Sequence, residues 1–585
     1  MLRSAIGLLA LLATAQVLAS CSGNVSSPES PSLSLEKSSH DLTFACTEGM
    51  LPSSSLSRLS KTQYVNTLHD LLEAQLPSYF DALWPVVTSV LSALPDDTIS
   101  KVAPFSTMDQ AVSQQHVDTY FTIAQTVAQQ LTQDDAHVAA LLGCQSGEAE
   151  LECVDRFIRQ FGRRAFRHTL LDAEHDFLSG VYAATGIDAA GLADVITVAL
   201  NAPQFLYRVE FGDRPVHGKP NTYTLSGPEL ASRLAFHFWQ TMPDDALLDS
   251  AEAGELASDK GYAKLVEQLR ADPRTGASMR VFVNEWLALS DLRELDSLVG
   301  DATFDAFVGN DTPSAALRDD MISEVEDSFL FHLGRDDAFA DWFVSPYSFA
   351  KSDELAAIYA SEKWDGKSAL PPRFPIGQRS GLLTRAALLA TGSAKTRPIM
   401  KGVFVRTRIL CDRVPPPPAN ATTIPAELTS TMTTRKVVET LTEQPGSTCA
   451  SCHATLINPL GFATENYDAL GRIRAAEVLY SAEGNAAGEQ PVLTASTPRV
   501  WSDDDTTSTG AADVAELILH SGKAEACFAR QYIRFAYGRT EDDQVDGCAL
   551  ESVRSALESG QSLQQAIRAP VVRPEFRQRF VGDVQ

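Results

Sequence analysis

The sequence is short of positive charge: 48 lysines and arginines stand against 75 aspartates and glutamates, and the formal net charge is −27. Nucleic-acid binders need a basic surface, so this balance excludes nucleic acid as the expected partner. Strand-like alternation of polar and apolar residues is also rare, whereas apolar residues recur at helical spacing. The 585 residues are enough for several hydrophobic cores. We therefore predict a mainly α-helical protein built from several helical modules.

The apolar stretch from Ile6 to Leu18 is too short to span a bilayer comfortably. It follows a positive start at Arg3 and precedes small residues, which is typical of a signal peptide. Leu18-Ala19-Ser20-Cys21 resembles a bacterial lipobox, in which cleavage leaves the cysteine as a lipid-bearing first residue. The alternative is ordinary cleavage nearby, with Cys21 an idle thiol. Ser22 at the next position favours sorting to the outer membrane. We predict a lipoprotein of the bacterial cell envelope, on the periplasmic or surface face of the outer membrane.

Cysteine is scarce, with nine in the chain. Setting aside Cys21 and the two cysteines of the motif described next leaves six, an even number that predicts up to three disulfides in an exported protein. Free buried thiols are the alternative. The two local pairs each bracket a loop between helical stretches, and a third pair is left by elimination. The expected pairs are Cys144 with Cys153, Cys527 with Cys548, and Cys46 with Cys411.

The pentapeptide Cys449-Ala450-Ser451-Cys452-His453 has the spacing at which c-type haem is attached. The two thiols become thioethers to the porphyrin, and the imidazole of His453 is placed to bind the iron on the proximal side. A ligating histidine needs its second ring nitrogen held by an acceptor, and a loop containing Pro459 is expected to supply it. The motif predicts one haem c.

Three other interpretations of the motif are available. Cys449 and Cys452 have zinc-ribbon spacing, but a second Cys/His pair is missing nearby. A dithiol redox motif is disfavoured because no βαβ pattern surrounds it. A structural or vestigial motif without a cofactor is the third interpretation, and it stays open.

No methionine follows His453, although many small cytochromes take their sixth iron ligand from that part of the chain. The candidates elsewhere are Met400, Met432 and His520, and the sixth position without a protein ligand is a further alternative. The difference matters because two strong axial ligands favour electron transfer, whereas an open position permits peroxide or oxygen chemistry.

Gly, Pro and composition changes divide the chain into eight segments. The predicted segments are a signal peptide (1–20), a lipid-anchored Ser/Pro-rich tether (21–50), an N-terminal helical module (51–145), an Arg-rich helical module (146–215), a central helical module (222–350), a module with the haem motif (375–475), a polar loop with a hairpin (476–510) and a C-terminal helical module (511–585).

Several helices are specific expectations. Ser60 with Gln63 forms a capping box, and Ser226 starts another helix with Pro in its first turn. His237 on that second helix is expected to be a core histidine, and residues 379–394 are expected to form a helix. Five arginines on one helix are expected to pair with acids, an anion site being the alternative: Arg156, Arg159, Arg163, Arg164 and Arg167.

Several stretches together resemble the planctomycete-type cytochrome c group, large exported multidomain bacterial proteins whose modules have no known function. The haem motif is followed by Asn458-Pro459-Leu460-Gly461-Phe462 and Glu465-Asn466-Tyr467-Asp468, which carry the resemblance at the haem segment. The other similar stretches are residues 58–64 with 70–72, 161–167, 230–239, 397–411 with 415–418, 471–474 and 527–539. The resemblance implies a helical multidomain fold and a haem, but no substrate.

The leading hypothesis is a lipid-anchored, mono-haem, cytochrome c-like protein that transfers electrons to or from a redox partner protein in the envelope. A second hypothesis is an envelope oxidoreductase whose haem reacts with peroxide, oxygen or an organic substrate. The third is a structural or surface-binding protein whose haem motif is unused.

Overall fold

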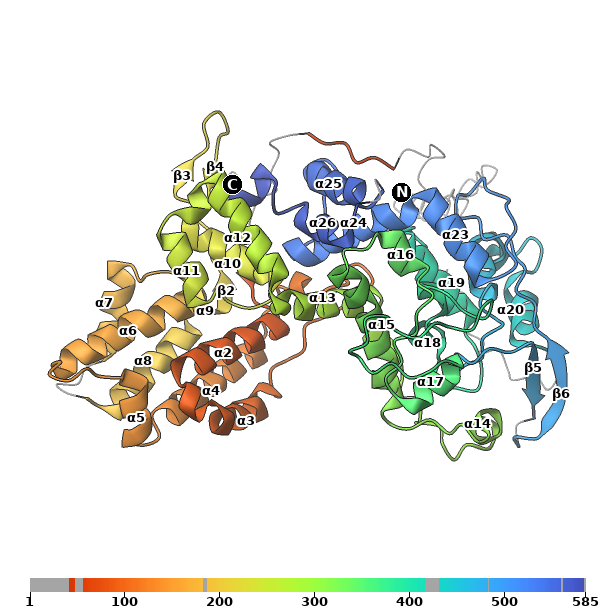
Figure 1. Cartoon of the computed structure of the whole chain (residues 1–585), viewed down its shortest axis with the longest axis horizontal. Coiled ribbons are helices and arrows are strands. Elements are labelled where there is room, and N and C mark those ends of the chain that lie inside the picture. Colours follow the sequence, from red (N-terminus) through yellow and green to blue (C-terminus); the bar gives the residue numbers. More distant parts are fainter. Residues whose placement is uncertain are drawn as a thin grey trace, which may run out of the picture.

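The computed structural model describes residues 42–47, 56–182, 187–415, 431–481, 483–558 and 561–582. These residues form a mainly helical protein with small antiparallel sheets, as predicted. Two helical lobes lie side by side, and the C-terminal helices lie between them (Figure 1). The predicted signal peptide, the lipidation site Cys21 and most of the tether lie outside the described residues. No helix in the described ranges is long and apolar enough to cross a membrane.

The first lobe contains the helices drawn from red to yellow-green in Figure 1. Its capping boxes at Ser60/Gln63 and Ser226/Glu229 are formed as predicted, because each N-cap hydroxyl accepts a backbone N–H of the first turn. The helices are α2 (Lys61–Gln75), α3 (Phe80–Leu91), α4 (Gln114–Leu131), α5 (Asp135–Leu142), α6 (Glu150–Phe166), α7 (Asp172–Val181), α8 (Ala189–Asn201), α9 (Pro203–Leu206), α10 (Gly227–Phe238), α11 (Asp245–Glu252) and α12 (Asp259–Ala271).

Helix α13 (Pro273–Trp286) connects the first lobe to the second, and α24 to α26 lie above the junction (Figure 1). The remaining helices are α14 (Ala302–Val308), α15 (Leu317–Gly334), α16 (Phe339–Phe343), α17 (Asp353–Tyr359), α18 (Ala386–Leu389), α19 (Pro398–Phe404), α20 (Thr434–Thr442), α21 (Thr448–Cys452), α22 (Asn458–Phe462), α23 (Ala511–Ser521), α24 (Lys523–Tyr537), α25 (Gly547–Glu558) and α26 (Leu563–Arg568).

The strands form three small sheets, two of which join distant parts of the chain. β1 (Ser57–Arg58) pairs with β2 (Tyr207–Arg208), and β4 (Thr222–Thr224) pairs with both β3 (Arg214–Pro215) and the C-terminal β7 (Gln578–Phe580). The predicted hairpin after the haem segment is confirmed as β5 (Ala476–Tyr480) and β6 (Ala486–Pro491).

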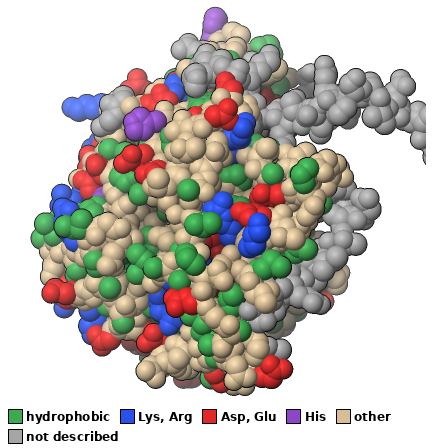
Figure 2. All heavy atoms as spheres, turned by 90° about the vertical axis from the view of Figure 1, so that its right-hand side faces the viewer, with side chains coloured by type: hydrophobic (Ala, Val, Ile, Leu, Met, Phe, Trp, Pro, Cys, Tyr) green, Lys and Arg blue, Asp and Glu red, His purple; other side chains and the backbone are tan. Residues whose placement is uncertain are grey.

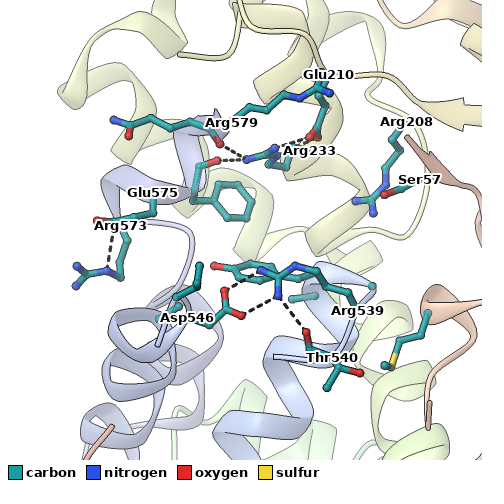
Figure 3. A pocket seen from close by; sticks show the side chains of 18 of the residues that line it. Ser57, Arg208, Glu210, Arg233, Arg539, Thr540, Asp546, Arg573, Glu575 and Arg579 are labelled. Carbon is teal, nitrogen blue, oxygen red and sulfur yellow. Dashed lines mark hydrogen bonds and ion pairs between the residues drawn. The ribbon is translucent and has the colours of Figure 1, made fainter. Parts of the chain in front are cut away.

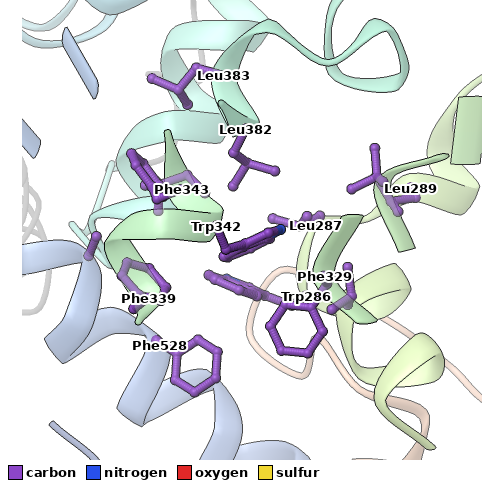
Figure 4. Close-up of a cluster of buried hydrophobic side chains, with 14 of the residues drawn as sticks. Trp286, Leu287, Leu289, Phe329, Phe339, Trp342, Phe343, Leu382, Leu383 and Phe528 are labelled. Atoms are coloured by element: carbon purple, nitrogen blue, oxygen red, sulfur yellow. The ribbon is translucent and has the colours of Figure 1, made fainter. Parts of the chain in front are cut away.

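The hydrophobic cores do not follow the order of the segments. One core unites α2 to α8, so residues on both sides of position 145 share it. The largest core joins α13, α15 and α16 with α24 and α25. At its centre the rings of Trp286 and Trp342 lie 5.8 Å apart, and Phe528 packs edge-on against Trp286 at 5.4 Å (Figure 4). The C-terminal helices therefore complete a core that α13 begins.

His237 is a core histidine, as predicted. It is buried, and its Nε2 lies 3.0 Å from the hydroxyl of Tyr532 on α24. Burial lowers the pKa of His237 to about 4, so the ring is neutral at pH 7. This contact ties α10 of the first lobe to the C-terminal helices.

The prediction of a helix over residues 379–394 is wrong. The chain forms only a short 3-10 turn (Leu382–Thr384) and the four-residue α18 there. Gly381 has a φ of +69°, and a Cβ at this position would lie 2.2 Å from the carbonyl oxygen of Phe343. A left-handed residue in close backbone contact interrupts a helix.

The expectation that the arginines of α6 pair with acids is confirmed for four of the five. Their partners are Glu148 for Arg156, Asp155 for Arg159, Asp249 and Glu252 for Arg163, and Asp245 for Arg164. Arg167 is instead buried, and it donates to the carbonyl oxygens of Phe205 and Tyr207.

Candidate haem site

The two motif cysteines lie on α21, which Ser447 caps by accepting the backbone N–H of Ala450 at 3.2 Å. Cys449 and Cys452 are three residues apart, and this spacing places both thiols on one side of a single helical turn. Both are half-buried and unpaired. They are therefore positioned for a flat group that attaches at two points.

The other six described cysteines are all in disulfides, which sets the two motif cysteines apart. The predicted pair Cys144–Cys153 is confirmed. The two other predicted pairings are wrong: Cys527 pairs with Cys411, and Cys548 pairs with Cys46.

Packing explains the exchange of partners. Residues 42–47 lie against the start of α25, where a Cβ at Gly547 would come within 1.9 Å of the carbonyl oxygen of Ala45. That approach brings Cys46 to Cys548. Cys527 lies on α24 opposite the segment 405–409, and its thiol is 3.3 Å from the carbonyl oxygen of Arg408, so it meets Cys411.

His453 begins a π-helical turn, η7 (His453–Ile457), that leads directly into α22. Its Nδ1 lies 3.2 Å from the side-chain oxygen of Asn458. Asn458 is fully buried, and its amide nitrogen donates to Thr442 Oγ1 at 3.0 Å and to Glu443 Oε1 at 2.8 Å. A chain of polar contacts thus runs from the end of α20 to the histidine.

This chain of contacts determines which ring nitrogen of His453 carries the hydrogen. The Glu443 carboxylate only accepts hydrogen bonds, so it requires the NH2 group of Asn458 on its side. The Asn458 oxygen then faces His453 and accepts a hydrogen bond from Nδ1–H. Nε2 is left with its lone pair, and it has no hydrogen-bond partner among the described residues. This is the tautomer that a metal-binding histidine needs.

The prediction that a loop containing Pro459 holds the histidine is wrong. Residues 458–462 form a helix rather than a loop, with Pro459 in its first turn. The carbonyl oxygen of Pro459 accepts a hydrogen bond from Ser496 Oγ at 2.7 Å. Asn458 was visible in the sequence as the fifth residue after His453, but its role depends on Thr442 and Glu443, which only the fold brings to it.

Helix α19 supports the haem segment through two glycines. A Cβ at Gly402 would lie 2.0 Å from the carbonyl oxygen of Ile457, and one at Gly461 would lie 1.9 Å from that of Pro398. Real Cβ atoms cannot approach so closely, so α19 and α22 pack backbone to backbone only because both positions are glycine.

Arg406 fixes the π turn from the other side. It is fully buried, its Nε donates to the carbonyl oxygen of Leu456 at 2.8 Å, and it pairs with Asp412 at 3.0 Å. Asp412 also contacts Lys523 on α24. This network links the haem segment to the C-terminal helices.

Two charged side chains are buried behind the α19–α22 pair. Burial lowers the pKa of Lys401 to about 8, and Nζ has no hydrogen-bond partner among the described residues. Burial also raises the pKa of Glu465, which accepts a hydrogen bond from Thr396 at 2.8 Å. A cavity of about 20 Å³ beside Lys401 is large enough for one water.

Met400 is turned away from the motif. Pro398 and Gly402 face α22 and η7, and successive helical residues are about 100° apart, so Met400 lies on the opposite side of α19. Its side chain is 56% exposed. His520 is exposed on α23, with Nδ1 2.7 Å from the carbonyl oxygen of Glu516. Met432 just precedes the N-terminus of α20 and lines a groove beside β6, whereas α20 contacts Asn458 through Thr442 at its other end.

The residues present fit a covalently attached haem better than a zinc ion. Zinc ligands must converge on one point, yet Cys449, Cys452 and His453 do not form a group of ligand atoms within 4.8 Å of one another in the part of the chain that the structure describes. Two free thiols on one turn and an imidazole with a free Nε2 match the donor set of c-type haem.

The fold and the site define a helical multidomain protein with a cytochrome c-like CxxCH segment. The chain belongs to the planctomycete-type cytochrome c group, because four of its stretches match modules of that group. Each module is described as a protein of unknown function: PSD3 (DUF1587) matches residues 57–133, PSD5 (DUF1595) 153–210, PSD4 (DUF1592) 225–360 and PSCyt3 (DUF1588) 379–477.

The PSCyt3 match contains the whole haem motif together with α19, α22 and Asn458. The resemblance noted for residues 527–539 stays a prediction. No curated protein and no solved structure matches the chain.

Proposed function

We propose that this protein binds one haem c covalently and transfers electrons in the bacterial cell envelope. Cys449 and Cys452 would hold the porphyrin as thioethers, and His453 Nε2 would bind the iron. When bound, the group supplies a one-electron redox centre. The observation that carries the proposal is the contact from Asn458 to His453 Nδ1, which leaves Nε2 free to ligate.

The cysteine pattern supports the same proposal. The described chain forms three disulfides, as expected for an oxidising compartment, yet leaves Cys449 and Cys452 unpaired. Cysteines in that compartment escape disulfide formation when another covalent bond uses their sulfur atoms. Attachment to haem is such a bond.

The location and partners are part of the proposal. The lipobox-like sequence at Cys21 supports a lipid anchor, and Ser22 supports the outer membrane. We propose a redox partner protein in the envelope, and the net charge of −27 is compatible with a basic one. Replacing Cys21 with Ala is expected to release the protein from membranes. Unchanged membrane fractionation would contradict the anchor.

A haem-dependent oxidoreductase is the second candidate function. It is favoured by the position of Met400 on the far side of α19 and by the absence of methionine after His453 in the sequence. Carbon monoxide and cyanide separate the two functions. A low-spin spectrum that neither ligand changes supports electron transfer, whereas high-spin iron that binds them supports catalysis.

The pyridine haemochrome spectrum of denatured protein tests haem attachment. The wild-type protein, produced with the cytochrome c maturation machinery, should retain haem after denaturation, and the Cys449→Ala/Cys452→Ala variant should not. The Cys144→Ala/Cys153→Ala variant is the matched control, because it also removes two cysteines but should keep its haem. Wild-type protein without bound haem would leave only a structural or surface-binding role.

A further inference from the structure

A cavity of about 420 Å³ lies where the first lobe meets the C-terminal helices, away from the haem motif in the sequence (Figure 3). Its walls come from the β1–β2 sheet, α10, the end of α24, the start of α25 and the segment around β7. Both small sheets are formed by segments far apart in the chain, so the folded arrangement alone creates the cavity.

The cavity is rich in arginine. Five arginines and three acids line it, which leaves two positive charges in excess: Arg208, Arg233, Arg539, Arg573 and Arg579, with Glu210, Asp546 and Glu575. This excess is unusual for a chain whose net charge is −27. The opposite sign of the cavity indicates that it suits an anion.

The three acids are already engaged with arginines. Glu210 contacts Arg233, and Asp546 accepts two hydrogen bonds from Arg539, each 2.7 Å long. Glu575 lies 3.2 Å from Arg573. The carboxylates therefore neutralise and orient neighbouring guanidinium groups, and none of them pairs with Arg208.

Arg208 has no hydrogen-bond or ion-pair partner among the described residues, and its Nε is fully buried. Figure 3 shows its side chain directed from β2 into the space between Arg233 and Arg539. Burial lowers the pKa of Arg208; the nearby charge of Glu210 raises it in part, and that of Arg233 lowers it again. A buried cation is costly unless an anion accompanies it. Glu210 acts on Arg208 through its charge but is itself paired with Arg233, so no carboxylate of the described residues contacts the Arg208 guanidinium group.

The rest of the lining is suited to an organic molecule. Apolar side chains from three parts of the chain contribute to the walls, namely Ala103, Met108, Ala536, Val545 and Phe576. Pockets of several hundred Å³ with apolar walls and a few convergent polar groups are typical of small-molecule sites.

We propose that this cavity binds a small organic molecule bearing two carboxylates, with Arg208 as its main anchor. The two excess positive charges match two carboxylates, and the planar guanidinium group can donate two parallel hydrogen bonds to a carboxylate. The proposal is independent of the haem, since none of the haem-motif residues lines the cavity.

Calorimetric titration of the full exported chain tests the proposal, at constant ionic strength because charge interactions are screened by salt. The probes are phthalate, succinate and citrate, with neutral phthalamide and inorganic phosphate as comparisons. At least one dicarboxylate should bind with one-to-one stoichiometry, and phthalamide and phosphate should bind at least tenfold more weakly. Absence of binding by all three carboxylates, or equal binding of phosphate, would overturn the proposal.

Variants locate the site. Arg208→Gln should weaken dicarboxylate binding about 10- to 100-fold, the range for loss of a charge-assisted hydrogen bond. Arg214→Gln is the control, because Arg214 is exposed on β3 outside the cavity and carries the same charge. If Arg208→Gln does not fold, Ala103→Trp fills the cavity from a loop and should abolish binding. Unchanged binding in a folded Arg208→Gln or Ala103→Trp protein would place the ligand elsewhere.

Discussion

Asn458 Oδ1 lies 3.2 Å from His453 Nδ1, at the end of a polar chain that starts at the carboxylate of Glu443. This contact orients the His453 imidazole for the proposed binding of iron. It sets both the plane of the ring and the nitrogen that keeps its lone pair. The helix α20, which supplies Thr442, and the turn η7, which supplies His453, are thus joined through one buried amide.

Replacing Asn458 should change the reduction potential in opposite directions for two variants. Asn458→Leu removes the acceptor, makes the imidazole a weaker donor and should raise the potential, whereas Asn458→Asp strengthens the acceptor and should lower it. Covalent haem content should stay the same, because Cys449 and Cys452 are intact. Spectroelectrochemical titration measures the potentials. Shifts of the same sign in both variants would contradict the role given to Asn458.

The two glycines between α19 and α22 should be irreplaceable. Gly402→Ala or Gly461→Ala should cost about 3 kcal/mol or more, because the added Cβ would meet a backbone carbonyl oxygen at 2.0 or 1.9 Å. Gly276→Ala, on α13 with nothing within 4 Å of the added Cβ, is the control and should stabilise the protein by about 0.5–1 kcal/mol. Urea denaturation measures all three, and equal stability of the three variants would refute close packing here.

The sequence predicted the helices where the local signal is complete. Ser60 with Gln63 and Ser226 with Glu229 cap their helices through bonds that span only three residues. The prediction of a helix over residues 379–394 was wrong because Gly381 packs against Phe343, and this contact cannot be inferred from the neighbouring sequence.

At the candidate haem site and the arginine-rich cavity too, only features set by neighbouring residues could be predicted. The attachment motif is contiguous and could be recognised from its spacing. Asn458 could not be assigned because its partners Thr442 and Glu443 lie at the C-terminal end of α20, with α21 in between. Arg208 depends on a sheet that joins residues over 100 positions apart. The exposed face in Figure 2, where acidic, basic and apolar side chains are interspersed, offers no comparable signal.

The disulfide pairing should differ from the local one that the sequence suggests. Non-reducing digestion and mass spectrometry should recover Cys46 linked to Cys548 and Cys411 linked to Cys527. Removing Cys411–Cys527, which closes 116 residues, should cost about 4–5 kcal/mol, against about 3 kcal/mol for Cys144–Cys153, which closes 9. A peptide containing Cys527 linked to Cys548 would show that α24 and α25 are arranged differently.

His237 should make the protein sensitive to acid. Its folded-state pKa of about 4 lies below the ordinary value of 6.5, so between these pH values the unfolded chain binds the proton and the folded chain does not. Stability from this group is therefore present above pH 6.5 and falls by up to about 3 kcal/mol as the pH drops to 4.

The His237→Gln variant isolates this effect when its free energy of unfolding is compared with that of the wild-type protein at each pH. The difference should shrink as the pH falls from 6.5 to 4. His217→Gln, on an exposed loop, is the matched control for the loss of a histidine outside the core. A constant difference for His237→Gln would mean that the ring has the same pKa in the folded and the unfolded protein.

The most direct test of the account is tryptic mass spectrometry of the protein from cells that mature c-type cytochromes. We expect the peptide containing Cys449 and Cys452 to carry one haem through both sulfurs. Recovery of that peptide with both thiols unmodified would contradict the proposed electron-transfer function.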